Sequence, residues 1–492
     1  MDKGAHVIEA ENRPTAAVAA ARLIPRPRDE SGPGAALLAR QGKRESNART
    51  YARNFGIAPV SASGMEVTDA DGRVFLDCLS GAGTLALGHN HPVVIEALRR
   101  VIDSGVPLHA LDFATPEKDA FTTELLSRLP SAFADRARLH FCGPAGTDAV
   151  EAALKLTATA TGRSSLLAFT GAYHGMTAGA MAVTGNTEVR ARLGTTATQT
   201  TRLPFPYSYR CPFGVGGDAG SRIAATYVER FLDDPAGGIL PPAAMILEAV
   251  QGEGGAVPAP DEWLRAMRRI TAERGIPLIL DEVQAGVGRT GAFWGFEHSG
   301  ITPDVVVMSK AIGGSLPLAV IAYHQDLDVW GPGAHTGTFR GNTLAMATGT
   351  ATLRFVAENQ LAERAAELGA RMTGVLQQMA RRFPTIGDVR GRGLMLGVEL
   401  VDPAGTPDAC GSLPPASALA AQVRRECLSR GLIVELGGRH DAVVRLLPPL
   451  TMTDAQADTV LDRLGEALAA AQHFTGTVTS TGTGTSTGTG PA

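Results

Sequence analysis

Residues 277–314 read PLILDEVQAGVGRTGAFWGFEHSGITPDVVVMSKAIGG. Two short apolar runs in this stretch, residues 277–280 and 305–308, are followed by charged side chains: Asp281 and Glu282 after the first run, and Lys310 after the second. Short apolar runs without polar alternation are typical of strands buried on both faces, as in a parallel sheet. Because the carboxyl ends of parallel strands meet at one edge of the sheet, we expect Asp281 and Lys310 to face one crevice.

Further apolar runs on either side of this stretch alternate with helical patterns, at residues 138–141, 165–169, 244–247 and 318–322. This alternation predicts an α/β fold with a mainly parallel sheet covered by helices on both faces. Residues 64–79 and 391–401 differ, because turn residues such as Asp71-Gly72, Gly391 and Gly393 interrupt them as in hairpins. We interpret them as a second, smaller α+β domain built from both ends of the folded region.

Helical patterns at residues 92–104, 344–382 and 417–430 would link and cover these layers. The predicted division of the chain is a mobile N-terminal extension (1–33), the N-terminal part of the small domain with an entrance segment (34–110), the large cofactor-binding domain (111–365), the C-terminal part of the small domain (366–473), and a disordered Thr/Gly/Ser tail (474–492).

The overall composition excludes several classes of partner. Among 492 residues, 44% are hydrophobic and 19% charged, with a net charge of -4 spread over both signs, so nothing favours nucleic acid or an anionic membrane surface. No segment approaches the ~20 apolar residues that span a bilayer. The five cysteines are widely spaced and form no C-x-x-C pair, so we expect no metal site and a reduced, cytoplasmic, soluble protein.

Lys310 is the first candidate for covalent chemistry. A lysine directly after a buried strand lies where burial lowers the pKa of its amine, which suits a Schiff-base lysine; the alternative is a lysine that merely extends to the surface. Asp281 favours the first interpretation. An enzyme that uses pyridoxal-5'-phosphate (PLP) needs a carboxylate beside the ring nitrogen as well as the lysine.

A Gly-rich turn supplies a candidate phosphate site. Residues 143–148 read GPAGTD and open a helical pattern at residues 149–156, so the N–H groups of Gly146 and Thr147 could hold an anion. The alternative is a simple helix cap. Tyr173 could stack on one face of a cofactor ring and Val283 on the other, although a single aromatic residue often only fills a core.

Together these motifs resemble the class III (omega) aminotransferases of PLP fold type I, over roughly residues 46–470. The motifs occur in the family order: GTDAVEA from Gly146, AYHG from Ala172, E-x-x-QGE from Glu248, DEVQ from Asp281, SK at Ser309-Lys310, and TFRGN from Thr338. Residues 45–51, 77–92 and 173–177 are most similar to the diaminobutyrate:2-oxoglutarate branch. The resemblance implies a seven-stranded, mainly parallel sheet between helices.

The resemblance also assigns roles around the cofactor. Lys310 would form the Schiff base (aldimine) and move the proton, Asp281 would pair with the ring nitrogen, and Gln284 would lie near the phenolic oxygen. Gly146 and Thr147 would bind phosphate, and Tyr173, His174 and Val283 complete the cofactor-binding set. Thr338 matches a residue that reaches the phosphate of the neighbouring subunit, which implies a homodimer with shared active sites.

The substrate residues follow from the same resemblance. Arg445 matches the arginine that binds the α-carboxylate of glutamate or 2-oxoglutarate, and its guanidinium suits that task. Glu253 matches the carboxylate that pairs with this arginine when a terminal amine reacts; the alternative is a permanent ion pair.

Met176 departs from the family pattern, because many relatives have there an arginine that grips the distal carboxylate. Tyr51, Arg53 and Arg340 are candidate substitutes, with a surface or interface role open for Arg340.

The implied activity is ping-pong transamination. Amino transfer runs between L-glutamate/2-oxoglutarate and L-aspartate 4-semialdehyde/L-2,4-diaminobutyrate, with small amino and keto acids as partners and PLP as cofactor. Three alternatives remain: an omega-aminotransferase for ornithine, acetylornithine or 4-aminobutyrate; a PLP aminomutase or racemase; and a PLP-binding protein without turnover.

Overall fold

The computed structural model describes residues 31–187, 190 and 199–472. The predicted N-terminal extension, apart from residues 31–33, and the predicted Thr/Gly/Ser tail lie outside these residues. Among the residues described, no helix is both long and apolar enough to cross a membrane.

A seven-stranded sheet forms the centre of the larger layer, in the order β4-β12-β11-β10-β7-β5-β6. All neighbouring pairs are parallel except those of β12, which runs antiparallel to β11 and β4. This confirms the predicted α/β fold. The strands are β4 (Ala137–Phe141), β5 (Ser165–Phe169), β6 (Thr200–Leu203), β7 (Pro242–Leu247), β10 (Leu278–Asp281), β11 (Val305–Met308) and β12 (Val320–His324).

Alternate residues of these strands enter two different cores. In β10, Leu278 and Leu280 join one hydrophobic cluster with Trp263 of α12, whereas Ile279 joins a second cluster with Ala149 of α8. Side chains alternate across a strand, so a continuous apolar run supplies both faces at once. The helices of this layer are α5 (Pro92–Ser104), α6 (Pro116–Ser127), α7 (Ser131–Ala134), α8 (Gly146–Thr161), α9 (Ala178–Val183), α11 (Gly217–Asp233), α12 (Asp261–Glu273) and α13 (Thr343–Glu358).

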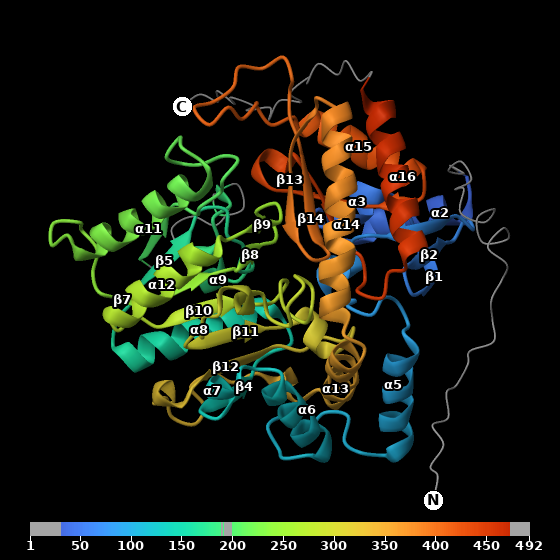
Figure 1. The fold of residues 1–492 in the computed structure, drawn as a ribbon. Helices are drawn as coiled ribbons and strands as arrows, with labels where there is room; N and C mark the ends of the chain where they lie inside the picture. The colour runs from blue at the N-terminus through green and yellow to red at the C-terminus, as the bar shows by residue number, and fades with distance from the viewer. Residues whose placement is uncertain (1–30, 188–189, 191–198, 473–492) are drawn as a thin grey trace, which may run out of the picture.

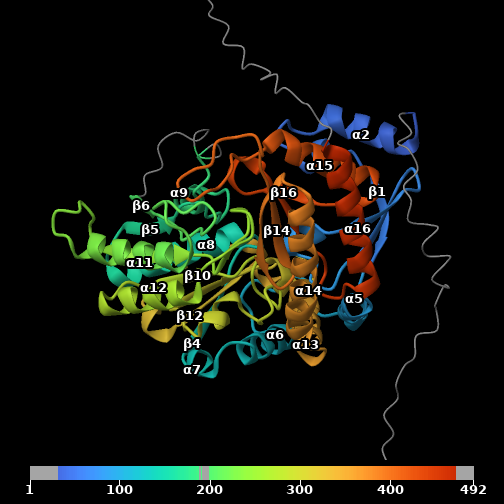
Figure 2. The ribbon, with the colours of Figure 1, turned by 45° about the horizontal axis from the view of Figure 1, so that its top comes forward.

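The smaller layer joins both ends of the described chain. Strand β15 (Leu432–Ile433) pairs in parallel with β3 (Val74–Asp77), which follows the hairpin of β1 (Pro59–Ser63) and β2 (Glu66–Asp69). A second sheet has the order β13-β14-β17-β16, from β13 (Ile386–Arg392), β14 (Met395–Leu400), β16 (Glu435–Gly437) and β17 (Val443–Leu446). Figure 1 shows the N-terminal α2, β1 and β2 in blue beside the orange and red α14, α15 and α16, and Figure 2 shows the same grouping after a turn.

The helices of this layer are α2 (Pro33–Arg44), α3 (Tyr51–Phe55), α14 (Leu361–Arg382), α15 (Ser417–Ser429) and α16 (Asp454–Ala471). Shorter elements are α4 (Ser80–Gly83), β8 (Val250–Gln251), β9 (Val257–Pro258) and the 3-10 turns η1 (Gly295–Ser299), η2 (Lys310–Gly313), η3 (Gln325–Leu327), η4 (Thr338–Gly341) and η5 (Arg439–Asp441).

One expected helix is two. The pattern at residues 344–382 contains α13 and α14, which are separated at Asn359 and Gln360, where Gln360 has a left-handed backbone (φ 52°). A non-glycine residue in that conformation interrupts the helical hydrogen-bond ladder, so α14 starts in a new direction.

Candidate active site

A cavity of about 220 Å³ lies at the carboxyl ends of the parallel strands. Asp281 ends β10, Lys310 follows β11, and Glu248 follows β7. The expected convergence of strand ends is therefore present. The lining residues are Gly146, Thr147, Tyr173, His174, Gly175, Met176, Glu248, Glu253, Asp281, Val283, Gln284 and Lys310.

Lys310 opens the 3-10 turn η2 with a left-handed backbone, φ 50°. Its amine is directed into this cavity, where burial lowers its pKa even though the charges of Glu253 and Asp281 act in the opposite direction. A buried amine with a lowered pKa is more often neutral, and a neutral amine is the form that attacks a carbonyl carbon.

Asp281 is held from two sides. Its Oδ1 accepts the N–H of Val283 at 3.0 Å, and its Oδ2 lies 2.7 Å from Nδ1 of the fully buried His174. Burial opposes a charge on His174, but the hydrogen bond and negative charge of Asp281 outweigh it and raise the pKa of the imidazole. The pair therefore keeps a carboxylate fixed at the floor of the cavity.

Glu248 lies behind this pair. Its carboxyl group accepts the N–H groups of Tyr173 (3.0 Å) and Gly252 (2.9 Å), and burial raises its pKa to about 7 despite the nearby His174. These bonds position the segment that carries Tyr173 beside the cavity.

The start of α8 forms another part of the cavity wall. The first N–H groups of a helix have no intrahelical partner, so those of Gly146 and Thr147 are available to an anion. A Cβ at Gly146 would lie 3.0 Å from Cγ1 of Val283, so this turn closely approaches the segment that follows β10. The Thr147 hydroxyl is 2.7 Å from that of Thr177.

Gln284 faces the same cavity. Its Nε2 donates to the carbonyl oxygen of Ala82 at 3.0 Å, while its buried Oε1 has no partner among the described residues. A buried amide oxygen without a partner is costly unless a bound molecule supplies a donor.

A buried ion-pair cluster adjoins the cavity. Arg445 of β17 is 1% exposed, and its Nη2 lies 2.9 Å from Glu253 and 3.3 Å from Glu435. Gly437 makes room for this guanidinium, because a Cβ there would lie 2.6 Å from Nε of Arg445. The predicted partners Arg445 and Glu253 are therefore in contact, with a second carboxylate beside them.

Sequence reasoning missed Glu435. It is the direct cross-strand partner of Arg445 in the antiparallel pair β16–β17, so the two side chains share one face. The only signal was the short E-L-G run at residues 435–437, which precedes β17 by a few residues.

The remaining predicted residues lie at the periphery. Tyr51 belongs to the same electrostatic cluster: burial and the carboxylates of Glu435 and Glu253 raise its pKa to about 12, against the effect of Arg445. Met176 lines the cavity but is 54% exposed. Arg53 donates to Asn47 at 2.7 Å on the surface.

Thr338 and Arg340 lie on η4, outside the lining of this cavity. Thr338 is exposed, and Arg340 forms an ion pair with Asp112. In this chain, the contact favours the surface or interface role for Arg340 over a grip on substrate.

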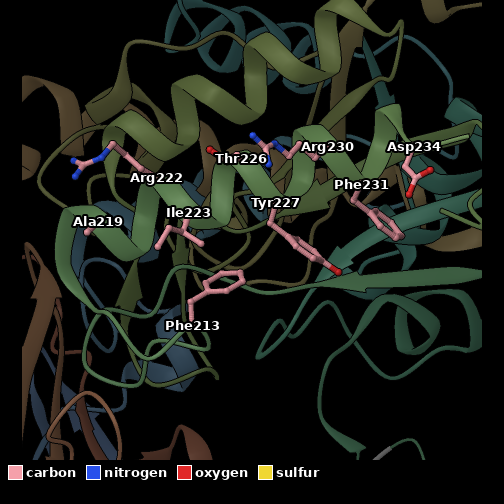
Figure 3. A pocket seen from close by; sticks show the side chains of 9 residues that line it. All are labelled: Phe213, Ala219, Arg222, Ile223, Thr226, Tyr227, Arg230, Phe231 and Asp234. Atoms are coloured by element: carbon pink, nitrogen blue, oxygen red, sulfur yellow. The ribbon is translucent and has the colours of Figure 1, made fainter. Parts of the chain in front are cut away.

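A larger cavity of about 620 Å³ lies elsewhere, against α11. Figure 3 shows the rings of Phe213, Tyr227 and Phe231 along one side of that helix. No lysine, histidine or glutamate is among the described residues that line it. We therefore place the chemistry in the smaller cavity, where a lysine, a histidine and several carboxylates converge.

Comparison with protein-family models gives one match. The model of the family described as aminotransferase class-III covers residues 48–468.

Two relatives cover most of the chain. Diaminobutyrate--2-oxoglutarate aminotransferase of Rhizobium meliloti (strain 1021) is 57% identical over 434 residues, which are 88% of this chain and 92% of the relative. The protein of the same name from Haemophilus influenzae is 48% identical over 435 residues, 88% of this chain and 95% of the relative.

Solved structures share the fold. An (S)-enantioselective omega-transaminase from Thermomicrobium roseum has a TM-score of 0.79 at 27% identity, covering 89% of this chain and 99% of that chain. An amine transaminase from an uncultivated Pseudomonas species, solved in its PLP-bound form, has a TM-score of 0.77 at 28% identity, covering 87% and 97%.

Proposed function

The chain belongs to the class III aminotransferases, and we propose that it exchanges the terminal amino group of L-2,4-diaminobutyrate with 2-oxoglutarate, giving L-aspartate 4-semialdehyde and L-glutamate, in either direction. One observation carries the chemistry. Asp281 and Lys310 come from the ends of the neighbouring parallel strands β10 and β11 and line a single cavity, and transamination on PLP requires both a carboxylate and a lysine.

PLP is the cofactor of this family, and the cavity fits it. The N–H groups of Gly146 and Thr147 suit its phosphate, the unpartnered Oε1 of Gln284 suits a donor on the ring, and Asp281 suits the ring nitrogen. When bound, PLP supplies an aldehyde carbon that takes up amino groups and a ring that withdraws electrons from the carbon bearing them.

In this proposal, Lys310 has two roles. Its Nζ would hold the cofactor when it is bound, and the same amine would accept and return a proton at the reacting carbon of the substrate. The lowered pKa of Lys310 suits both, because an amine that is partly neutral accepts a proton and returns it within one cycle.

Asp281 and His174 hold a proton at the ring nitrogen. The carboxylate of Asp281 favours a positive nitrogen, and the hydrogen bond from His174 keeps the carboxylate oriented. Tyr173 and Val283 both line the cavity, and we assign them to the two faces of the planar ring.

Arg445 and Glu253 serve the two substrates in turn. Glutamate and 2-oxoglutarate bring an α-carboxylate that replaces Glu253 on the guanidinium, whereas with a terminal amine Glu253 stays paired. Glu253 is suited to this exchange because its side chain is 37% exposed, in contrast to the enclosed Arg445. If Arg445 and Glu253 stayed paired permanently, Arg445 could bind the α-carboxylate of neither glutamate nor 2-oxoglutarate.

The test is a panel of amines. The PLP-loaded protein is given 2-oxoglutarate and, separately, L-2,4-diaminobutyrate, L-ornithine, N-acetylornithine or 4-aminobutyrate, and glutamate is measured. We expect diaminobutyrate to give the highest kcat/KM. A preference for another amine would keep the family and discard this substrate, and bound cofactor without glutamate from any amine would favour an aminomutase or racemase.

We further propose a cytoplasmic homodimer with the domain division given above. All five cysteines are free, which agrees with a reducing compartment. The rings of His109 and Phe339 pack in a tilted arrangement with centroids 5.6 Å apart. Exposed apolar side chains lie in the same segments, Leu108, Leu111 and Phe113 beside His109, and Phe339 beside Thr338 on η4. Contiguous exposed apolar residues of this kind support a subunit interface.

A further inference from the structure

The three charged groups in direct contact at Arg445 carry one negative charge in excess, and Arg424 is the next cation along the wall that Glu435 lines. A single guanidinium contacts two carboxylates, Glu253 at 2.9 Å and Glu435 at 3.3 Å, when all three groups are ionised. Unbalanced charge in a poorly solvated place is unfavourable, and a bound cation relieves it. Because Nε and Nη1 of Arg445 also have no hydrogen-bond partner among the described residues, the cluster favours a ligand that brings a positive group for Glu435 and an acceptor for Arg445.

Glu435 is the carboxylate of this cluster that can still accept a hydrogen bond. Its Oε2 is buried and has no hydrogen-bond donor among the described residues, although Arg445 lies close enough for an ion pair. Burial raises the pKa of Glu435, and the charges of Arg445 and Lys310 oppose that rise. Arg445 links Glu435 to Glu253, and Glu253 lines the cavity that contains Lys310.

Glu435 also borders open space. It lines a second cavity of about 420 Å³ together with Thr50 and Asn54, next to Tyr51 of α3. The negative charge of Glu435 contributes to the raised pKa of the Tyr51 hydroxyl, which places the two side chains close to each other. Glu435 is thus placed between the surface segment at residues 50–54 and the cavity that contains Lys310.

We propose that Glu435 binds the α-ammonium group of the diamino acid while the terminal amine of the same molecule reacts at the cofactor. The inference rests on the proposed function and names the residue that distinguishes a diamino acid from a simple terminal amine. An ammonium group supplies the donors that Oε2 lacks and the positive charge that the cluster lacks.

The experiment compares two donors that differ at this position only. L-2,4-Diaminobutyrate and 4-aminobutyrate have the same chain, and only the first bears an α-ammonium group. The ratio of their kcat/KM values with 2-oxoglutarate is measured for the cofactor-loaded wild type and for Glu435→Gln. We expect the ratio to fall about tenfold or more, mainly through KM for diaminobutyrate, because a charged hydrogen bond is replaced by a neutral one.

Two controls accompany the variant. Glu466→Gln makes the same chemical change at a side chain that is 68% exposed on α16, and the ratio should stay at the wild-type value. The half-reaction with glutamate, followed by the absorbance change of the cofactor, should change less than about threefold in Glu435→Gln, since glutamate uses the carboxylate site on Arg445.

The outcomes separate the proposals. Equal losses with both donors and with glutamate would show that Glu435 only supports Arg445, and would overturn the inference. A wild type without diaminobutyrate activity would overturn the proposed function before any variant is made. Should Glu435→Gln fail to fold or to load cofactor, Tyr51→Phe removes the neighbouring hydroxyl at a 48% exposed residue, and an unchanged ratio there would equally overturn the inference.

Discussion

At the scale of single residues, Lys310 combines a left-handed backbone with an amine in a buried cavity. A non-glycine residue in that conformation costs on the order of 1 kcal/mol, which the packed ends of β11 and η2 must offset. The strained turn directs the lysine into the cavity instead of along the strand. The residue with the proposed catalytic amine is therefore also the residue with an unfavourable backbone conformation.

Replacing Lys310 by alanine should abolish multiple turnover. The chain would lose both its covalent attachment point and the group that moves the proton, so we expect a loss of at least about a thousandfold. The measurement is glutamate formation from 2-oxoglutarate and diaminobutyrate. Lys43→Ala on the exposed face of α2 is the matched control and should retain wild-type rates; sustained turnover by Lys310→Ala would remove the assignment.

Covalent loading of the cofactor should depend on pH through Lys310. The ammonium form must lose a proton before it reacts, and burial lowers the pKa of this amine below the ordinary 10.5. Loading should rise with pH and reach half its maximum below 10.5, as monitored by the absorbance of the bound cofactor. A small lysine derivative in solution is the reference, and an identical pH curve for protein and reference would contradict the expectation.

The sequence could indicate Lys310 and Asp281 because each directly follows a continuous apolar run, and strand ends converge by a general rule. Glu435 could not be found in this way. Its role depends on the register of β16 against β17, which pairs it with Arg445, and a three-residue strand leaves too little pattern to predict a register.

At the scale of elements, the start of α8 is shaped by a neighbouring loop. Gly175 has φ 128°, and a Cβ there would meet the Thr147 hydroxyl and lie 2.6 Å from the Cβ of Thr147. The loop after β5 therefore approaches α8 as closely as backbone allows. This approach sets the position of the N–H groups that we assign to phosphate.

Gly175→Ala should weaken cofactor binding. The added methyl group would displace Thr147, and overpacking of this kind costs about 1–3 kcal/mol, so we expect the Kd for PLP to rise by about fivefold to 150-fold. Equilibrium titration of the cofactor measures it. Gly162→Ala is the control at the other end of the same helix, where φ is also positive (67°) but no atom lies within 4 Å of the added Cβ. This variant should lower the stability of the protein without changing the Kd for PLP. Equal Kd values for both variants would contradict the role of the loop.

Other elements show where pattern reading fails. Strand β6 (Thr200–Leu203) was missed because its TTRL sequence is polar, which an edge strand tolerates. The antiparallel direction of β12 could not be predicted from the sequence either, since an apolar run has the same composition in either direction. The break between α13 and α14 lies at Gln360, a residue type that gives no warning of a left-handed backbone.

At the scale of the whole molecule, the α/β fold and the smaller layer from both chain ends could be predicted from alternating runs and hairpin glycines. The proposed subunit interface could not be derived from those patterns. Its proposed residues, such as Thr338, lie outside their own chain's cavity, so any contribution to catalysis depends on a second copy.

Mixed dimers would test the proposed sharing of the active site between two subunits. We expect Lys310→Ala and Thr338→Asp each to be inactive or nearly so, the second because a carboxylate repels phosphate. In a mixed dimer, one site receives both changes and the other receives none, so mixing equal amounts should recover about one quarter of wild-type activity. No recovery after verified subunit exchange would place Thr338 in the site of its own chain.

The pairing of β15 with β3 joins Leu432 to Leu76. During synthesis the N-terminal hairpin must therefore wait, with the edge of β3 uncovered, until nearly the whole chain has left the ribosome. Unpaired strand edges promote association with other chains, and contacts between residues so far apart in the sequence form slowly. The smaller layer would then be the last part of the molecule to assemble. When the protein is made quickly, this layer is the part that we expect to need chaperones most.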